Sequence, residues 1–379
     1  MDFGFSEEQE MLRDAARRFL ADNCPTTYVR KMMAHNTAHD ADFYKKLVEL
    51  GWPGLLIPEQ YGGTGGTFLD LSVIMEEAGK ALLPGPFFAT ALLGVPLILE
   101  GGSDAQKQEL LPKLASGDLL ATLAIAEASG RFDPAGIGLK AEKKGARYVL
   151  SGEKLFVPDA HVANCIGVAA RSQQTSNPEQ GLSLFLVPAN SKGLSVTQLK
   201  TVDMTRRLCH LKFDGVEVEA GGLVGAEGQG WPILRRTLDV AVAGLCAEIV
   251  GTAQRALDMS VDYAKTRVQF GKPIGAFQAI KHKCVDMMVA VENARSLTYY
   301  ACWTVDERVA EAATAVPMAK AYASDMGKSV TSEAIQVHGG IGFTWEHDMH
   351  LYHRRALAGE ANLGNAPIHR EVVAKSLLG

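Results

Sequence analysis

The chain has 379 residues, of which 47% are hydrophobic and 21% charged, and its formal net charge is −5. These values predict a folded protein with a large core, divided into two or three domains, and they exclude a broad basic surface for nucleic acid or an anionic membrane. Six scattered cysteines without CxxC spacing indicate neither a zinc site nor a disulfide framework, so a reduced, cytoplasmic compartment is expected. The acidic first residues lack the apolar core of a signal peptide, and no apolar run is long enough to span a membrane.

Apolar residues in the first third of the chain follow the spacing of amphipathic helices. Ser6, followed by acidic residues, is the predicted N-cap of the first of them. The same periodicity predicts helices over 42–50, 69–80, 89–99 and 104–116, with glycine and proline at the breaks between them. We therefore expect an N-terminal helical domain over residues 1–121.

From about residue 120 the sequence changes to short runs of strand-forming residues separated by turns. These runs lie at 147–151, 166–170, 182–187, 194–199, 208–213 and 216–218, and they predict a middle β domain over 122–226. Helical periodicity then returns over 232–266, 278–306, 311–338 and 348–363. The expected fold class is α+β and multi-domain, with a C-terminal domain like a four-helix bundle over 227–379.

Two motifs in the last third have the residue types of a phosphate site. Arg267 and Phe270 belong to Arg-Val-Gln-Phe-Gly, and Gln278 follows. The donors of an arginine match phosphate oxygens in pairs, although the same residues also describe a helix that ends at glycine. In Gln-Val-His-Gly-Gly, which begins at Gln336, two glycines would let backbone N–H groups approach a pyrophosphate, although Gly-Gly after a helix is more often a simple turn.

The helix, strand, helix order and these motifs resemble the acyl-CoA dehydrogenase family over essentially the whole chain. The resemblance implies FAD as the cofactor, with the Arg267 motif reaching the flavin site of a neighbouring subunit. It implies cofactor-binding positions in the C-terminal part at Arg267, Phe270, Gln278, Gln336, Gly339, Gly340 and Asn365.

In the β domain the match to the family is weaker. Ala126, Phe156 and Pro158 stand where the family has a threonine, a tryptophan that stacks on the flavin, and a second threonine. Backbone contacts and an aromatic face at Phe156 are still available, whereas the hydroxyl contacts are lost. Plain β-domain packing is an equally good interpretation of each position.

The family's reaction is α,β-dehydrogenation of an acyl thioester, which needs a carboxylate base in a pocket poor in water. Leu363 stands where the resemblance expects that glutamate, and Ala241 occupies the other place that some relatives use. Glu248 lies seven residues after Ala241, and two helical turns bring it back to nearly the same face. We therefore predict Glu248 as the general base.

Two alternatives for the base position stay open. Glu248 would instead be structural if it formed a salt bridge with a neighbouring helix, for instance with Arg354 or Arg355. Glu360, one turn before Leu363, is a second candidate base. His338, His350 and His353 are interpreted as packing or helix-end residues, since no acidic cluster accompanies them to form a metal site.

The substrate is the least readable feature. An arginine that many relatives use falls at Val242, and the helix around it is thinned by small residues at Ala241, Ala243, Gly244 and Ala247. A roomy pocket for a bulky or branched acyl group follows as a hypothesis. The chain looks most like actinobacterial relatives that act on steroid side-chain thioesters as α2β2 complexes.

The resemblance also implies partners. It implies an acyl-CoA substrate, electron-transfer flavoprotein as the electron acceptor, and a homodimer, a homotetramer or an α2β2 assembly with a related subunit. Two rival functions remain. One is a partner subunit that supplies only half of a flavin site, and the other is a flavin monooxygenase on the same fold.

Overall fold

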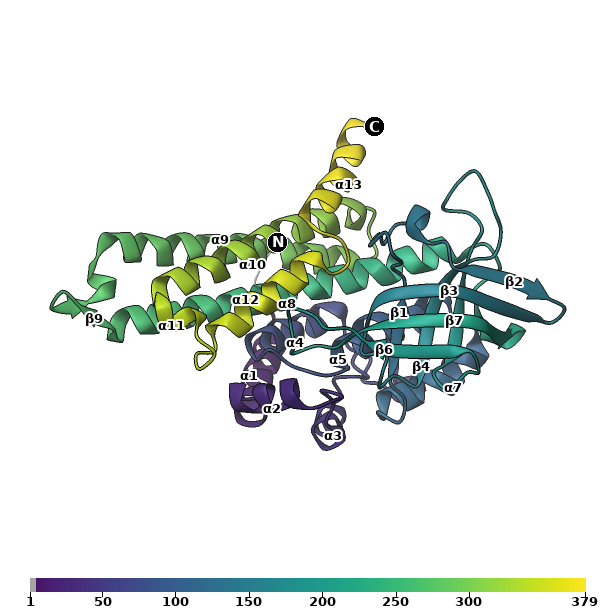
Figure 1. The fold of residues 1–379 in the computed structure, drawn as a ribbon, viewed down its shortest axis with the longest axis horizontal. Coiled ribbons are helices and arrows are strands. Elements are labelled where there is room, and N and C mark those ends of the chain that lie inside the picture. The colour runs from purple at the N-terminus through teal and green to yellow at the C-terminus, as the bar shows by residue number, and fades with distance from the viewer. Residues whose placement is uncertain (1–4) are drawn as a thin grey trace. The chain divides into compact units, whose positions relative to one another are not determined.

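The computed structural model describes residues 5–379 (Figure 1). The interpretation of the acidic N-terminus lies in part on residues 1–4, outside the described ones. Packing divides the chain into two compact units. The first comprises Met1–Lys31, Phe68–Leu83 and Val242–Gly379, and the second comprises Met32–Thr67 and Pro84–Ala241. Each unit is described by itself.

The second unit is built on an eight-stranded mixed sheet in the order β6-β7-β3-β2-β4-β5-β8, with β1 beside β4. The contacts of β4 with β1 and β2 are parallel, and the other pairs are antiparallel. The β-rich middle segment is thus a real sheet domain, as predicted. Its strands are β1 (Ala121–Ala124), β2 (Lys140–Lys144), β3 (Arg147–Pro158), β4 (Cys165–Arg171), β5 (Leu182–Pro188), β6 (Leu194–Gln198), β7 (Leu208–Glu219) and β8 (Leu223–Val224).

Two predicted strands, 208–213 and 216–218, are one strand in the structure. The chain stays paired with β3 on both sides of Gly215, which has φ +67° and bends β7 without ending it. The prediction of a break there was wrong because a glycine inside a strand can mark a bend as well as a turn.

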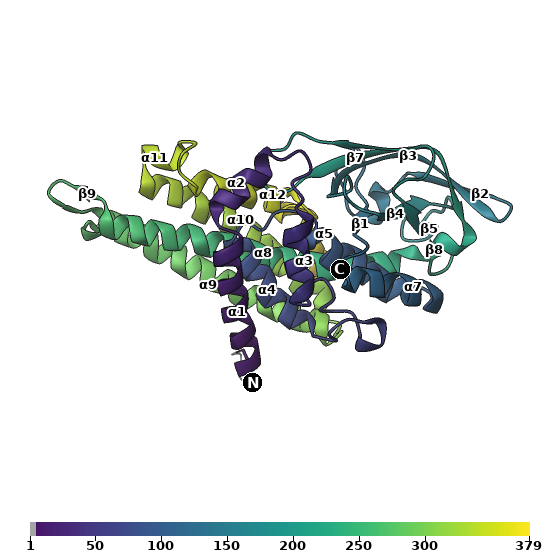
Figure 2. The same cartoon turned by 90° about the horizontal axis from the view of Figure 1, so that it is seen from below.

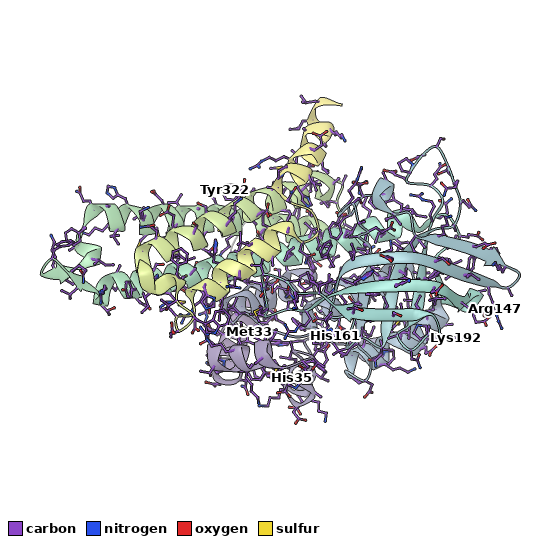
Figure 3. All side chains as sticks on the ribbon, viewed as in Figure 1. Met33, His35, Arg147, His161, Lys192 and Tyr322 are labelled. Carbon is purple, nitrogen blue, oxygen red and sulfur yellow. The ribbon has the colours of Figure 1, made fainter. Side chains whose placement is uncertain are left out.

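Short helices complete the second unit. They are α3 (Ala41–Glu49), α5 (Phe87–Ala89), a π-helical turn over Thr90–Gly94, α6 (Val95–Gly101) and α7 (Asp104–Ala115), with α2 (Thr26–Ala34) at the border between the units. Arg207 ties the segment after α2 to the sheet, since its Nη2 donates to the carbonyls of Met33 at 2.8 Å and His35 at 2.9 Å. Met33 and His35 are labelled in Figure 3.

The first unit is helical. Its N-terminal helix begins as predicted, because Ser6 and Gln9 form a reciprocal capping box. The long helices α9, α10 and α12 run side by side with the later part of α8, and Figure 2 shows the same arrangement from below. The helices are α1 (Glu7–Asn23), α4 (Phe68–Lys80), α8 (Gly230–Thr266), α9 (Gln278–Asp306), α10 (Ala312–His338), α11 (Gly340–Phe343), α12 (Met349–Ala361) and α13 (Ala366–Leu378), with the strands β9 (Val268–Gln269) and β10 (Lys272–Pro273) between α8 and α9.

Glycines bring α4 and α8 into close contact. A Cβ placed on Gly79 would lie 2.1 Å from the carbonyl oxygen of Glu248, and one on Gly251 would lie 1.8 Å from the carbonyl oxygen of Glu76. Thr252 adds a hydrogen bond across the same contact, from its hydroxyl to the carbonyl of Gly79 at 3.3 Å. The contact positions Glu248 within the first unit.

The predicted division into 1–121, 122–226 and 227–379 describes the order of helices and strands along the chain. Packing groups the helices differently, since α1 and α4 lie with the C-terminal bundle while α3 and α5 to α7 lie with the sheet. The three-domain division therefore stays a prediction. None of the described helices is long and apolar enough to cross a membrane.

Candidate functional site

Glu248, the predicted base, lies in the middle of α8 and is paired with an arginine of α12. Arg355 Nη1 donates to Glu248 Oε1 at 2.5 Å, and the two side chains are only 3% and 1% exposed. Arg355 Nη2 also reaches the carbonyl of Leu83 at 3.4 Å. The structure thus contains the salt bridge that the sequence left open as the alternative for Glu248. The catalytic role of Glu248 stays a prediction.

The turn between α12 and α13 carries Leu363, where the resemblance expects a base. Leu363 is buried and has φ 58°, in the left-handed region that a leucine seldom adopts, and Gly364 follows with φ 94°. The Asn365 side chain accepts a hydrogen bond from the backbone N–H of Ile368 at 3.2 Å and so caps α13. This cap gives Asn365 a structural role beside its predicted cofactor contact. Glu360, the second candidate base, is half-buried one turn earlier.

Lys320 of α10 holds this turn from inside the bundle. Its side chain is fully buried, and Nζ donates to the carbonyls of Gly359, Glu360 and Gly364 at 2.8 to 3.0 Å. His369 of α13 holds the turn from the other side, with Nε2 at 2.9 Å from the carbonyl oxygen of Leu363. The sequence analysis did not identify either residue as part of a site.

Arg267 and Phe270 lie on an exposed hairpin. The strands β9 and β10 form it between α8 and α9, at one end of the first unit (Figure 1). Arg267 is exposed and Phe270 is 92% exposed with φ 50°. The Phe270 ring meets the Phe277 ring edge-on, at 6.1 Å between centroids, and Gln278 begins α9 with an exposed side chain. A motif this exposed is available to a neighbouring molecule.

The Gly-Gly motif ends α10. Gly339 has φ 64° and ψ −144°, a backbone conformation open almost only to glycine, and a Cβ on Gly339 or Gly340 would meet nothing within 4 Å. Gln336 is exposed on the last turn of the helix. The backbone, not crowding, requires the first glycine, and both leave their main chain open to a ligand.

In the second unit, a β-bulge turns Phe156 outward. The register of β3 against β7 shifts between Lys154 and Val157, and Phe156 within the shift has φ 58° and is 44% exposed. A bulge that re-aims a side chain in this way is a common device at binding sites. Pro158, by contrast, is buried, and its carbonyl accepts a hydrogen bond from the Thr122 hydroxyl at 2.6 Å.

A buried ion pair fixes the segment that carries Ala126. Lys154 Nζ donates to the carbonyl of Ile125 and to Glu127 Oε1, both at 2.8 Å, and Glu127 also accepts from the backbone N–H groups of Gly138 and Leu139. Burial lowers the pKa of Lys154 to about 8 although Glu127 acts in the opposite direction. Ala126 is buried, and its carbonyl accepts from the N–H of Leu155 at 2.9 Å, so its backbone is held beside the bulge.

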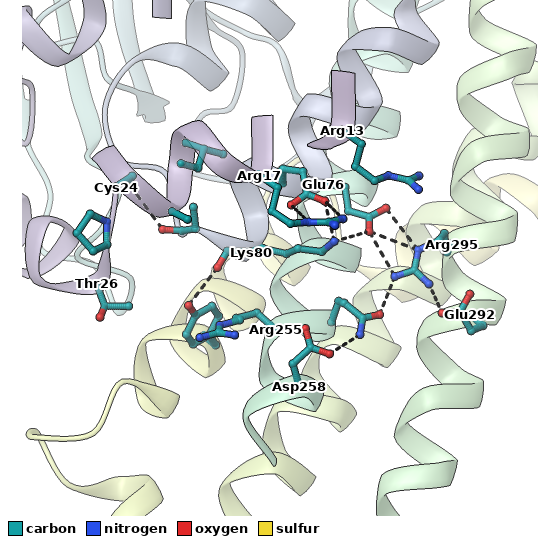
Figure 4. Close-up of a pocket in the computed structure, with 17 residues that line it drawn as sticks. Arg13, Arg17, Cys24, Thr26, Glu76, Lys80, Arg255, Asp258, Glu292 and Arg295 are labelled. Atoms are coloured by element: carbon teal, nitrogen blue, oxygen red, sulfur yellow. Dashed lines mark hydrogen bonds and ion pairs between the residues drawn. The ribbon is translucent and has the colours of Figure 1, made fainter. Parts of the chain in front are cut away.

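A cavity of about 920 Å³ lies in the first unit and was not predicted (Figure 4). Its buried acids are already partnered: Glu76 meets Arg295, Lys80 and the Tyr299 hydroxyl, while Glu77 meets Lys80 and an arginine of α1. Burial would raise the pKa of Glu76, but the charges of Lys80 and Arg295 and the Tyr299 hydrogen bond outweigh burial and lower the pKa. The buried acids of the cavity are therefore held by cations of the same lining.

No group of three or more histidine, cysteine, aspartate or glutamate side chains within residues 5–379 is arranged to hold a metal ion. Sequence reasoning missed Lys154 and Lys320 as site residues. A signal was present for Lys320, which is a lysine within an otherwise apolar or small-residue stretch, whereas Lys154 follows the charged Glu153 and gave no such signal. Nothing in the sequence indicated their hydrogen-bond partners.

Three sequence models of one family cover nearly the whole chain. The acyl-CoA dehydrogenase N-terminal, middle and C-terminal domain models match residues 6–118, 122–216 and 228–378. The chain therefore belongs to the acyl-CoA dehydrogenase family. It is an oxidoreductase, and FAD is its cofactor.

Similar proteins span the full length of the chain. The probable acyl-CoA dehydrogenase YngJ of Bacillus subtilis is 33% identical and covers 100% of both chains. Among solved structures, butyryl-CoA dehydrogenase from Megasphaera elsdenii has a TM-score of 0.93 at 30% identity, with 100% of both chains covered. A steroid ACAD, Tcur3481-Tcur3483, has a TM-score of 0.88 at 29% identity and covers 98% of each chain.

The residues present fit a bound dinucleotide, taken unit by unit. In the first unit, the open backbone at Gly339 and Gly340 and the exposed Arg267 suit phosphate oxygens. In the second unit, the bulge offers the ring of Phe156 as a stacking face. The hydroxyl donors that the resemblance expects at Ala126 and Pro158 are absent, so these positions contribute backbone only.

Proposed function

We propose that the chain oxidises the α,β bond of an acyl-CoA thioester whose acyl group is bulky, with a steroid-derived acyl group as the leading candidate. The observation that supports a bulky group is the run of buried small residues on α8 at Ala243, Gly244 and Ala247. The similarity to a steroid ACAD supports the same substrate class. The family of the chain supports the reaction itself.

The proposed cofactor-binding residues have separate roles in the reaction. FAD, when bound, accepts the hydride from the β carbon. Arg267, Phe270 and Gln278 bind the cofactor of a neighbouring subunit, and Gln336, Gly339 and Gly340 bind its pyrophosphate through open backbone and an amide. Phe156 provides an aromatic face, and the bulge keeps this ring exposed. Electron-transfer flavoprotein is the proposed acceptor of the electrons.

Glu248 is the proposed base, under a condition that the structure makes specific. A proton taken by Glu248 would remove the charge of one member of its buried pair with Arg355, and losing one charge of a buried pair is costly inside a protein. Catalysis by Glu248 therefore requires the pair to open or rearrange when substrate binds.

The same ion pair favours a second candidate function. If Glu248 serves only to balance Arg355, and Leu363 supplies no carboxylate, the chain has no base of its own among the proposed positions except Glu360. The chain would then be one half of a heteromeric dehydrogenase, in which a related subunit supplies the base. An α2β2 assembly is the expected form of this alternative.

The visible spectrum of the purified chain separates the two candidates. A complete enzyme purifies with FAD, and a suitable acyl-CoA bleaches the visible absorbance of this flavin under anaerobic conditions. A half-site subunit purifies with little flavin and gains both flavin and bleaching only when a related subunit is added. The proposed reaction is rejected if no acyl-CoA of a panel that includes steroid thioesters bleaches the flavin absorbance, either with the chain alone or with a related subunit added.

A double-mutant comparison tests the base. If Glu248 is the base, Glu248→Gln lowers kcat/KM by about 10²- to 10⁴-fold in the flavin-loaded protein. The double variant Glu248→Leu, Arg355→Met replaces the pair by apolar side chains and regains most of the stability lost on breaking the pair, which is about 3–5 kcal/mol. Under the base hypothesis this stable double variant stays inactive.

A purely structural Glu248 gives the opposite result, because the double variant then recovers activity together with its melting temperature. Glu371→Gln, at an exposed position of α13, is the matched control and leaves both quantities unchanged. Glu360→Gln is measured in parallel, since a loss of kcat there would move the base to the second candidate.

A further inference from the structure

The turn between α12 and α13 is held in a conformation that its own sequence does not favour. Leu363 has φ 58°, although it is a leucine with a Cβ that clashes with the following carbonyl in this region. Gly364 at φ 94° and the Asn365 cap complete the turn. A strained conformation of this kind persists only where surrounding contacts determine it.

Lys320 supplies most of those contacts. Its Nζ lies 3.0 Å from the carbonyl oxygens of Gly359 and Glu360, 2.8 Å from that of Gly364, and 2.9 Å from Ser324 Oγ. The ammonium has three N–H groups and four oxygen atoms within hydrogen-bond distance, so each N–H group has an acceptor available. It joins the C-terminal end of α12, where the carbonyls carry partial negative charge, to the turn that follows.

The buried ammonium of Lys320 carries a cost in stability at this position. None of the four acceptors is a carboxylate, and burial, opposed by Cys246 and Glu360, lowers the pKa of Lys320 to about 8. The titratable groups that face Lys320 are Cys246 of α8, Glu360 of α12 and His369 of α13. A buried cation without a close counter-charge costs free energy, and an apolar side chain of similar size would avoid that cost but leave the three carbonyls without their shared donor. What the lysine provides is a fixed location for three backbone carbonyls.

We infer that Lys320 is a positioning residue for the dehydrogenation: its buried ammonium fixes the Leu363–Asn365 turn in one conformation. The inference rests on the proposed function, because only the resemblance puts this turn beside the reacting thioester. Lys320 touches no substrate in this account. It acts through the backbone of the turn.

The test replaces the ammonium by an apolar side chain of similar length. In Lys320→Met, hydrogen–deuterium exchange of the peptide 359–369 becomes about tenfold faster or more, because the carbonyls lose their shared donor. In the flavin-loaded holoenzyme, kcat falls about tenfold or more while KM changes little, because a displaced turn impairs the chemical step more than binding. Exchange in a peptide of α9 serves as the internal reference.

Lys328→Met is the matched control, since Lys328 lies on the same helix with an exposed side chain. It leaves exchange and kcat unchanged. Lys320→Gln, which keeps a donor on a shorter side chain, gives an intermediate result in both measurements.

The outcomes separate this inference from the proposed function. Unchanged exchange of 359–369 in Lys320→Met overturns the inference, whatever the activity. Faster exchange with unchanged kcat per bound flavin means that Lys320 holds the turn but does not serve the reaction, which also overturns it. If the unsubstituted chain turns over no acyl-CoA, the proposed function fails and the catalytic part of the inference fails with it, while exchange still decides whether Lys320 holds the turn.

Discussion

At the scale of single residues, His369 reports on the same turn through its own ionisation. Its Nε2 must carry the proton, because the carbonyl oxygen of Leu363 at 2.9 Å can only accept. Burial, aided by the nearby charge of Lys320, lowers the pKa of His369 to about 4 despite the hydrogen bond to Leu363. The imidazole is therefore neutral in the folded protein at neutral pH.

We expect His369 to make the fold sensitive to acid. Its pKa is about 4 in the folded state and near 6.5 in the unfolded chain, so the unfolded chain binds more protons between these values. Stability from this group is complete above pH 6.5 and is lost as the pH falls toward 4. His369→Gln, which keeps a donor but does not titrate, should reduce the loss of unfolding free energy between pH 7 and 4.5 by about 2 kcal/mol, as measured by urea unfolding.

His282→Gln, at an exposed position of α9, is the control variant. Its free energy of unfolding should equal that of the unsubstituted chain at both pH values. Equal acid sensitivity of the His369→Gln variant and the unsubstituted chain would show that His369 is hydrated or already charged in the folded state.

The sequence could identify a site residue when its expected partner was a recognisable side chain, and not when its partners were main-chain atoms. Glu248 was recognisable as an isolated carboxylate on an apolar face, and Arg355 was one of two arginines within reach of it as a salt-bridge partner. The role of Lys320 was not recognisable, because three of its four acceptors are main-chain oxygens about 40 positions further along the chain. Backbone carbonyls look the same at every position of a sequence, so only the fold reveals which of them converge.

At the scale of elements, the contact of α4 with α8 depends on glycines that leave no room for a side chain. A Cβ on Gly251 would overlap the carbonyl oxygen of Glu76, since 1.8 Å is far less than any non-bonded contact allows. The helices must then move apart, and the buried charges that both carry must move with them.

We therefore expect Gly251→Ala to destabilise the protein by about 3 kcal/mol, at the upper end of the cost of overpacking. The better helix propensity of alanine offsets only about 1 kcal/mol. Thermal unfolding of the holo protein measures the effect. Gly221→Ala is the control, because a Cβ there meets nothing within 4 Å, and identical melting temperatures for the two variants would contradict the close contact.

Most elements with local signals were predicted, and two strands without such signals were missed. The helix after Ser6 follows from its capping box, and the long helices follow from their apolar period. β1 was missed because all four of its residues are buried and show no alternation, and β2 because its sequence Lys-Ala-Glu-Lys-Lys is almost wholly charged. α13 was missed although Asn365 and the proline after Ala366 are ordinary signals of a helix start.

At the scale of the whole molecule, α9 presents a row of exposed apolar side chains. They share one face of the helix and form two groups, Val285, Met288 and Val289 in its first half and Tyr300 and Trp303 near its end. Exposed apolar side chains gathered on one helix face are commonly covered by another protein surface. This apolar face is consistent with the expected assembly. In such an assembly the β9–β10 hairpin, which carries Arg267, would have a neighbouring subunit to contact.

We expect the chain to sediment as a dimer or a larger assembly, at twice its mass of 40.7 kDa or more. Met288→Lys combined with Val289→Lys should shift the species toward the monomer and release bound flavin, because both side chains are already half-exposed and the fold can tolerate them. Analytical ultracentrifugation with detection at the flavin wavelength follows both effects together.

Ser329→Lys, on an exposed position of α10, adds charge elsewhere and should leave the assembly intact. A monomeric unsubstituted chain that binds flavin fully would contradict the proposed donation of Arg267 across an interface.

The discontinuous first unit has a consequence for how the protein is made. The buried carboxylate of Glu76 finds its partner Arg295 219 positions later, so α4 leaves the ribosome long before the helix that neutralises it exists. Both segments of the sheet unit, Met32–Thr67 and Pro84–Ala241, are synthesised before α9, so this unit can close around itself first. Until α9 emerges, α4 is an apolar helix whose Glu76 has Lys80 beside it but lacks Arg295 and Tyr299, and this interval is when a nascent chain depends most on chaperones and is most easily lost to aggregation.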